Sequence, residues 1–257
     1  MEVVVIIMFC IGIIALGCYM FCQAFSNHLK QEQLSFSTFP KKFGKLTIFF
    51  ISDIHRRRIH PSLIERAKNK TDIVVIGGDL AEKGVPLQRV KENIILLKQL
   101  GPVYFIWGNN DYELNYGEFT LLLESLDVII LKNKTEVLER NGEKILFVGV
   151  DDMSQYPERI DVMLNKMADI SFKIVLAHNP KFIETFSDEE DVSLMLSGHT
   201  HGGQIRLFGF GPYEHGGVKQ INGMTLFVSN GYGTSLLPLR LGAKPEAHLI
   251  TLEHRMS

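Results

Sequence analysis

The sequence has only three cysteines, and all of them lie near its start, at Cys10, Cys18 and Cys22. Residues 26–257 therefore contain neither a disulfide nor a site in which cysteine thiolates bind a metal. This composition fits a reducing compartment without requiring one. The chain also lacks internal repeats, low-complexity tracts and long linkers.

An excess of charge of one sign is missing as well. The 27 Lys and Arg residues against 29 Asp and Glu give a formal net charge of −2. Because a protein that binds a phosphate backbone usually presents a strongly basic face, we expect no specific nucleic-acid partner. With 46% hydrophobic and 22% charged residues in 257, the sequence is typical of a globular protein large enough for a full core.

Charged residues are absent altogether from positions 3–25, where Gln23 is the one strongly polar side chain. A helix of this length extends about 34 Å, which exceeds the roughly 30 Å hydrocarbon core of a bilayer. We therefore expect residues 1–26 to form a transmembrane anchor. A buried helix of a soluble domain rarely stays uncharged for so long. A cleaved signal peptide is the sharper alternative, but Glu2 stands where such a peptide carries Lys or Arg.

Basic residues begin only after this segment, and their position predicts the orientation of the chain. The lysines nearest to it are Lys30, Lys41, Lys42 and Lys45. Because lysine and arginine are preferentially retained on the cytoplasmic side, we expect a single-pass protein of the cell membrane with a cytoplasmic C-terminal domain. We interpret residues 27–44 as a juxtamembrane linker. Its lysines either contact anionic headgroups, at about 1 kcal/mol each, or are ordinary solvated residues.

Residues 45–257 alternate short apolar runs with amphipathic stretches. Strands are predicted at 46–52, 72–76, 103–107, 128–131, 135–139, 144–150, 172–177, 192–196, 225–229 and 247–252. Helices are predicted at 61–69, 87–100 and 119–126. Strand–helix alternation in the first half implies parallel crossovers, whereas Asn141-Gly142 predicts a hairpin in the second. Together they predict one α/β domain, a two-sheet sandwich flanked by helices.

Five short polar runs each follow a predicted strand. They are Ser-Asp-Ile-His at 52–55, Gly-Gly-Asp at 77–79, Gly-Asn-Asn-Asp at 108–111, Ala-His-Asn at 177–179 and Gly-His-Thr-His-Gly-Gly at 198–203. The first four, taken singly, are equally typical of turns, caps or core histidines. The fifth is more specific, because two imidazoles two residues apart in a glycine-rich loop have few structural uses. Since sites collect at the carboxyl ends of strands, we expect one cluster of carboxylates, imidazoles and an amide that suits two divalent cations.

The ordered set of these runs resembles the calcineurin-like metallophosphoesterase superfamily, over about residues 45–252. Further stretches are similar to a bacterial membrane-associated branch: Gly-Gln-Ile-Arg at 203–206, Val-Ser-Asn-Gly at 228–231, Pro-Leu-Arg at 238–240 and Pro-Glu at 245–246. Five motifs in one order leave little room for chance agreement. The resemblance implies the metallophosphoesterase sandwich and a metal-dependent hydrolase of phosphoric esters or anhydrides.

The resemblance also implies a pair of metal ions. The ligands of one ion would be Asp53, His55, Asp79 and His201. Those of the second would be Asp79, Asn109, His178 and His199, so that Asp79 bridges the two. Manganese, iron or zinc suits such nitrogen and oxygen ligands, and we favour manganese. A hydroxide bridging the ions at Asp79 would attack phosphorus in line.

One position departs from the family pattern. Many members have a histidine directly after the ligand asparagine, where it contacts the phosphate and can protonate the leaving group. Here that residue is Asn110, which can donate a hydrogen bond but cannot act as a general acid. Either the substrate carries a good leaving group, as a pyrophosphate or an activated phosphodiester does, or His60 or His215 replaces the acid. A plain surface position is the commoner explanation for each of these two histidines.

Several arginines are candidate ligands of the substrate phosphate. Arg56, Arg57 and Arg58 follow the first motif, where a guanidinium group can bind a phosphate through two parallel hydrogen bonds. A solvated run of charge is the alternative explanation. Arg240 is a further candidate for the same role.

These features predict a membrane-anchored, two-metal phosphoesterase that acts on a phosphodiester or pyrophosphate. The substrate would be a phosphorylated small molecule or a lipid-linked compound near the membrane. Two other functions stay open: a metal-binding regulatory module without turnover, which only Asn110 supports, and a phosphomonoesterase such as a protein phosphatase. Relative rates on diesters and monoesters separate the three.

Overall fold

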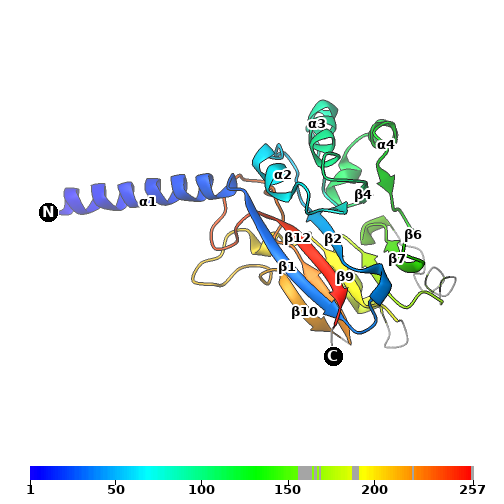
Figure 1. The fold of residues 1–257 in the computed structure, drawn as a ribbon. Helices are drawn as coiled ribbons and strands as arrows, with labels where there is room; N and C mark the ends of the chain where they lie inside the picture. Colours follow the sequence, from blue (N-terminus) through cyan, green and yellow to red (C-terminus); the bar gives the residue numbers. More distant parts are fainter. Residues whose placement is uncertain (156–163, 165–166, 168, 187–190, 222, 256–257) are drawn as a thin grey trace.

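The computed structural model is an α/β sandwich in which two six-stranded mixed sheets pack against each other (Figure 1). It describes residues 1–155, 164, 167, 169–186, 191–221 and 223–255. The first sheet has the order β1-β12-β2-β3-β4-β5. Its strands are β1 (His28–Phe36), β2 (Leu46–Ile51), β3 (Ile73–Gly77), β4 (Val103–Ile106), β5 (Ile129–Ile130) and β12 (Glu246–His254).

The second sheet has the order β10-β11-β9-β8-β7-β6. Its strands are β6 (Lys134–Arg140), β7 (Glu143–Gly149), β8 (Lys173–Leu176), β9 (Leu194–Ser197), β10 (Gly217–Ile221) and β11 (Met224–Val228). Strands β2 to β5 are parallel to one another in the first sheet, as are β7, β8, β9 and β11 in the second. The predicted hairpin is the β6–β7 pair. The two-sheet α/β prediction is confirmed.

Apolar side chains fill three layers of core. The layer between the sheets includes Phe50, Ile106, Phe147 and Leu196, all fully buried. A second layer lies under the helices α2 (Pro61–Ala67), α3 (Leu87–Leu97) and α4 (Tyr116–Ser125), which flank the first sheet (Figure 1). A third lies on the outer face of the second sheet. Strands buried on both faces read as continuous apolar runs, and for this reason the sequence located most of them.

Short 3-10 helices follow several strands and shape the loops of the site. They are η1 (Lys41–Phe43), η2 (Asn110–Glu113), η3 (Met153–Gln155), η4 (Pro180–Thr185) and η5 (His201–Gly203). Two of them, η2 and η5, directly overlap the polar runs at 108–111 and 198–203. These runs are therefore ordered turns at strand ends, not strand extensions.

Helix α1 (Glu2–Ala24) projects from the sandwich as a single rod (Figure 1). It is long and apolar enough to cross a membrane by length and composition. Its end is joined to the domain by the Arg240 backbone N–H, which donates to the Met20 carbonyl at 3.0 Å. The guanidinium of Arg57 donates to the Phe25 carbonyl at 3.1 Å.

The segment 27–44, expected to be a linker, is structured as part of the domain. Strand β1 pairs with β12 in parallel along its whole length, from His28 opposite Glu246 to Phe36 opposite His254. Because β1 is a half-exposed edge strand, its sequence lacks the apolar run that marks a buried strand. The other edge strand that the sequence missed, β10, is half-exposed for the same reason. The folded domain thus begins at about His28.

Candidate metal centre

The predicted metal ligands all stand in loops that leave the carboxyl ends of parallel strands. Those of the first sheet follow β2, β3 and β4: Asp53, His55, Asp79 and Asn109. Those of the second follow β8 and β9: His178, His199 and His201. The loops of the two sheets are bonded to each other, because the His199 backbone N–H donates to Asp53 Oδ1 at 3.0 Å. Both sheets therefore contribute to one site.

The backbone at this site is unusually bent. The φ angle is positive at five of the predicted ligands: Asp53 (54°), His55 (51°), Asp79 (51°), His199 (71°) and His201 (51°). Residues other than glycine rarely adopt this left-handed conformation. Such strain persists where surrounding contacts impose it, and it concentrates at functional sites. The bends turn these polar side chains toward one another.

One group of three ligands could hold a cation. The ligand atoms of Asp53, His55 and His201 all lie within 4.8 Å of one another. The Nε2 atoms of His55 and His201 are 3.1 Å apart, and His201 Nε2 is 3.5 Å from Asp53 Oδ1. Two imidazole nitrogens facing a carboxylate at these distances are a donor set suited to a borderline divalent ion.

A second group lies beside the first and shares Asp53 with it. Asp53, Asp79 and His178 also place ligand atoms within 4.8 Å of one another. His178 Nε2 is 3.2 Å from Asp79 Oδ2 and 3.3 Å from His199 Nδ1. The same Asp79 oxygen is 3.7 Å from His55 Nε2 in the first group. Asp79 thus reaches both groups, as a bridging carboxylate must.

Asn109 supplies an independent sign that the site accepts a cation. Its side-chain N–H donates to Asn110 Oδ1 at 3.0 Å. The buried Asn109 Oδ1 has no hydrogen-bond partner within the described part of the chain. A buried polar atom without a partner costs free energy unless a ligand satisfies it. The residues therefore fit a bound divalent metal.

Neighbouring groups hold two of the imidazoles in the orientation that a metal requires. His178 Nδ1 lies 2.8 Å from the Gly77 carbonyl, and His55 Nδ1 lies 2.9 Å from Glu82 Oε2. A histidine that donates its Nδ1 proton to an oxygen presents its Nε2 lone pair to a metal. Glu82 had no predicted role, because the polar run at 77–79 ends before it.

Charges at the site shift the pKa values of its histidines in opposite directions. Although burial opposes it, the Asp79 carboxylate raises the pKa of His178 to about 10. The pKa of His55 is also raised, by Glu82 and Asp79 against the effect of burial. Burial lowers the pKa of His201 to about 3, so this imidazole is neutral. Without a metal, a proton on His178 balances the charge of the Asp79 carboxylate.

Glycines let the ligand loops approach closely. A Cβ atom on Gly78, whose φ is +85°, would lie 2.5 Å from His178 Nδ1. A Cβ on Gly108 would lie 2.3 Å from Asp79 Oδ1. Real Cβ atoms do not tolerate such distances, so a side chain at either position would displace a ligand. The glycines of the polar runs are thus required by packing around the site.

Asp111 joins the loop after β3 to the loop after β4. Its buried carboxylate accepts the backbone N–H groups of Asp79 at 2.8 Å, Gly108 at 2.9 Å and Ala81 at 3.0 Å. Burial and the nearby Asp79 charge raise the pKa of Asp111 to about 7. The residue belongs to the predicted run at 108–111 but had no assigned role, because its partners come from another strand end.

The match with known proteins covers most of the chain. A family described as calcineurin-like phosphoesterase matches residues 46–203. The chain belongs to the calcineurin-like phosphoesterase family. The phosphoesterase is 43% identical to the Bacillus subtilis protein YpbG over 244 residues, which are 93% of this chain and 92% of that protein. It is 29% identical to the Escherichia coli phosphodiesterase YaeI over 255 residues, covering 90% of each.

A solved structure supports the fold. The Haemophilus influenzae NAD nucleotidase NadN superposes with a TM-score of 0.55 at 20% identity, over 74% of this chain and 45% of that one. Family membership and the candidate metal-binding residues make the protein a metal-dependent phosphoester hydrolase.

A cleft of about 370 Å³ opens over the metal-binding residues of the phosphoesterase. Its floor includes Asp79, Asn109, His199 and His201. Asn110 lies at its side, with its backbone N–H donating to Asp79 Oδ1 at 2.8 Å and its side-chain N–H to Glu113 Oε1 at 2.9 Å. Further lining comes from the loops after η5 and β11: Gly203, Gln204, Pro212, Tyr213, Ser235 and Leu236.

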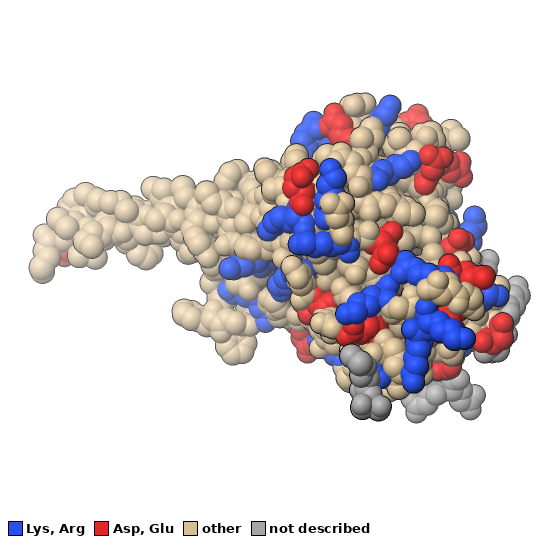
Figure 2. All heavy atoms as spheres, in the orientation of Figure 1, with Lys and Arg blue, Asp and Glu red and all other residues tan. Residues whose placement is uncertain are grey.

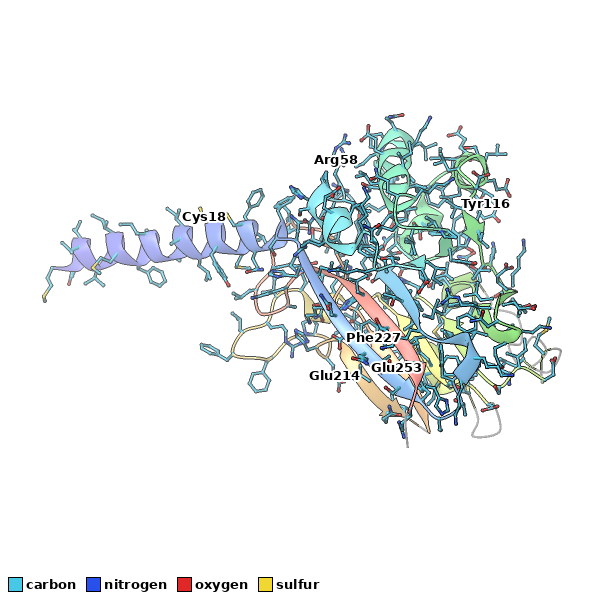
Figure 3. All side chains as sticks on the ribbon, in the orientation of Figure 1. Cys18, Arg58, Tyr116, Glu214, Phe227 and Glu253 are labelled. Carbon is cyan, nitrogen blue, oxygen red and sulfur yellow. The ribbon has the colours of Figure 1, made fainter. Side chains whose placement is uncertain are left out.

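The arginine triplet does not lie in this cleft. Arg57 is buried, stacks on the Tyr232 ring at 3.8 Å and donates to backbone carbonyls at the end of α1. Arg56 pairs with Glu82, and Arg58, labelled in Figure 3, pairs with Glu92 of α3. All three guanidinium groups have protein partners. Arg56 pairs with Glu82, which in turn contacts His55.

Arg240 is also buried and has no access to a substrate phosphate. Its guanidinium donates to the carbonyls of Gly233 at 2.7 Å and Asn230 at 2.8 Å. Its Nη2 lies 3.2 Å from His201 Nδ1. Arg240 is therefore a positioning residue that holds the His201 loop, in place of the predicted phosphate ligand.

The two histidines considered as replacement acids stand apart from the ligands. His60 is the N-cap of α2, where its Nδ1 accepts from the Ser62 backbone N–H at 3.2 Å. His215 is exposed, and its nearest side-chain partner is Asn230 Nδ2 at 3.3 Å. His60 is thus a helix cap, and His215 lines a neighbouring pocket with Thr200 and Tyr213.

Proposed function

We propose that the protein hydrolyses a phosphodiester or a pyrophosphate with a pair of divalent metal ions, manganese being the favoured one. The observation that carries the proposal is the position of Asp79, whose Oδ2 lies 3.2 Å from His178 Nε2 in one ligand group and 3.7 Å from His55 Nε2 in the other. Beside it, Asn109 Oδ1 has no hydrogen-bond partner among the described residues. Metal ions held there supply an acidified water as nucleophile and offset the charge on the phosphoryl oxygens. The phosphodiesterase relative YaeI supports the diester specificity.

The chain's own residues suggest how a substrate would be held. Asn110 lines the cleft next to Asp79, and its amide can donate to a phosphoryl oxygen once it turns from Glu113. No histidine takes the place of a general acid among the described residues that line this cleft, apart from the ligands His199 and His201. We therefore infer a substrate whose leaving group departs without protonation by the enzyme.

We also propose that α1 anchors the enzyme in the cell membrane with the domain in the cytoplasm. Its length and apolar composition support a membrane span. The arginines around its C-terminal end, Arg56, Arg57, Arg58 and Arg89, support the orientation, because such residues are retained on the cytoplasmic side. An anchored enzyme would meet substrates that are membrane-bound or released there.

The experiment uses the full chain in detergent, stripped of metal and reloaded with manganese. We would compare hydrolysis of bis-p-nitrophenyl phosphate with that of p-nitrophenyl phosphate, with Asp79→Asn as the control. Metal-dependent cleavage of the diester that is lost in the control supports the proposal. A faster rate on the monoester would indicate a phosphomonoesterase. Two bound ions without turnover of either compound would indicate a binding module.

A further inference from the structure

Two loops at the mouth of the metal cleft expose large apolar side chains. They are residues 205–213 and 234–239, here called the apolar loops. Phe208 is 100% exposed, Phe210 82% and Leu236 93%. Contiguous exposed apolar groups of this size on a soluble protein usually mark a binding surface.

The first apolar loop forms a hairpin that is held by hydrogen bonds. The backbone N–H groups of Leu207 and Phe210 each donate to the other residue's carbonyl at 2.9 Å. Phe208 occupies the turn with a φ of 51°, where glycine or asparagine is usual. The Arg206 guanidinium donates to the Gly202 carbonyl at 3.0 Å and to the Gly209 carbonyl at 2.5 Å. These hydrogen bonds therefore order the hairpin while its two phenylalanine side chains stay exposed.

The second apolar loop is fastened to the first through Gln204. The Gln204 side chain donates to the carbonyls of Ser235 at 3.0 Å and Leu237 at 3.2 Å. It also accepts the Ser235 backbone N–H at 2.8 Å. Leu236, between these contacts, has a φ of 59° and is 93% exposed. The two loops thus form one rim.

This rim lies beside the candidate membrane span. Figure 1 shows both loops, in gold and orange-brown, on the side of the sandwich from which α1 emerges. The residue after the second loop, Arg240, is bonded through its backbone N–H to Met20 in the last turns of α1. If α1 crosses a bilayer, the rim meets the surface of that bilayer.

The charge around the rim matches a lipid surface. The apolar loops contain no Asp, Glu or Lys, and their single arginine, Arg206, is used inside the hairpin. Figure 2 shows a tan, uncharged projection next to the helix and blue basic groups where the helix joins the domain. Arg56, Arg58 and Arg89 line one pocket with Phe25 and Asn27 at the end of α1. Apolar side chains next to basic ones are the usual pattern of a surface that enters the headgroup region.

We propose that the apolar loops insert into the bilayer beside α1, so that the metal cleft opens at the membrane surface and receives an amphiphilic phosphoester or pyrophosphate directly from the lipid phase. Pro212, Tyr213, Ser235 and Leu236 belong to the apolar loops and also line the cleft. A substrate headgroup in the cleft would therefore keep its hydrocarbon chain against the rim. This inference rests on the proposed function, since it names the physical state of that substrate.

The first test measures depth in the membrane with tryptophan. The full chain would be placed in nanodiscs whose phosphatidylcholine carries bromine on its acyl chains, and quenching would be compared with nanodiscs of ordinary lipid. The variants are Phe208→Trp in the rim, Phe9→Trp in α1 as the positive control, and Leu121→Trp as the matched control. Leu121 is 67% exposed on α4, and the native Trp107 is buried and gives a constant background.

We expect several-fold stronger quenching of Phe208→Trp than of Leu121→Trp. Quenching at Phe9→Trp but not at Phe208→Trp would overturn the inference and show that the rim faces solvent, a protein or a second copy. No quenching at Phe9→Trp would overturn the anchor, and the docking with it. Neither result depends on catalysis.

The second test separates docking from chemistry. The double variant Phe208→Asp, Phe210→Asp should hydrolyse soluble bis-p-nitrophenyl phosphate at the normal rate, because neither side chain lines the cleft. On a p-nitrophenyl ester of a phosphatidic acid embedded in nanodiscs, its kcat/KM should fall at least tenfold, whereas Leu121→Asp should leave it unchanged. Equal losses on both substrates, or none on the lipid, would contradict the inference. Inactivity of the unaltered protein on both would instead refute the proposed function and leave the quenching result standing.

Discussion

Two adjacent asparagines at this site are suited to different ligands. Asn109 turns its carbonyl oxygen toward the metal-binding residues and leaves it without a partner among the described atoms. Asn110 places its amide at the side of the cleft, where Glu113 holds it. The first residue is chemically suited to bind a cation and the second to bind a phosphoryl oxygen. Neither can transfer a proton at neutral pH.

The substitution Asn110→His should restore a general acid. A positioned acid commonly contributes about 10²–10⁴-fold to the rate of a reaction with a poor leaving group. We expect the kcat/KM for an alkyl phosphomonoester to rise at least about tenfold relative to that for bis-p-nitrophenyl phosphate. The backbone N–H to Asp79 Oδ1 is retained in the variant. Asn110→Gln is the matched control, and an equal ratio in both variants would show that protonation does not limit the reaction.

Metal binding should release protons. In the metal-free site the Asp79 carboxylate raises the pKa of His178 to about 10, so this imidazole is protonated near neutral pH. A cation that binds His178 must displace this proton, and its apparent affinity should rise about tenfold per pH unit until the pH passes the raised pKa. Calorimetric titration of Mn²⁺ in two buffers with different ionisation enthalpies measures the release. Identical heats in both buffers would contradict the prediction.

At the scale of elements, strand ends build the site and an edge strand completes the domain. Loops after β2, β3, β4, β8 and β9 carry the residues proposed as metal ligands, whereas β1 carries none of them. Instead, β1 covers the edge of β12, and its Phe36 ring packs on Phe172 at 5.1 Å between centroids. Lys30 pairs with the buried Glu246 at 2.7 Å. An element with no catalytic residue thus stabilises the strand that lies next to β2.

Two truncations should test the boundary of the domain. A chain that begins at residue 27 keeps β1, whereas one that begins at residue 38 loses it. Removing the half-buried Leu34 and Phe36 should cost about 3 kcal/mol or more, which lowers the melting temperature by about 6–12 °C. Thermal unfolding followed by circular dichroism measures the difference. Equal melting temperatures would show that residues 28–36 act as the linker that the sequence suggested.

At the scale of the whole molecule, α1, the apolar loops and the mouth of the cleft share one side. The backbone bond from Arg240 to Met20 and the side-chain contacts from Arg57 to the end of α1 fasten the helix to the domain. The orientation of the cleft would therefore follow the orientation of the helix in the membrane.

Reporter fusions should show the C-terminus in the cytoplasm. A green fluorescent protein joined after Ser257 should fluoresce in a bacterial host, whereas alkaline phosphatase at the same position should be inactive. Basic residues lie only after α1, so replacing Glu2 and Val3 by lysine should weaken this preference. An active phosphatase fusion to the unaltered chain would place the domain outside the cytoplasm.

The sequence alone determined the chemistry and most of the elements. The residues proposed as ligands, such as Asp53, His55 and His199, can be recognised in the sequence because their identity is local. Buried strands can be recognised because an apolar run is local. The family and the two-sheet α/β fold followed from the order of these runs. The edge strands β1 and β10 were not predicted, because partly exposed strands lack the continuous apolar run that marks a buried strand.

Only the tertiary structure decided which polar and apolar residues depart from their usual places. Arg57 and Arg240 are buried among carbonyls, and Glu82 orients His55, because loops distant in sequence meet at the strand ends. Phe208 and Leu236 stay outside, although apolar residues are normally buried. Contacts between segments far apart along the chain carry no local pattern, so burial and exposure of this kind become known only when the fold brings those segments together.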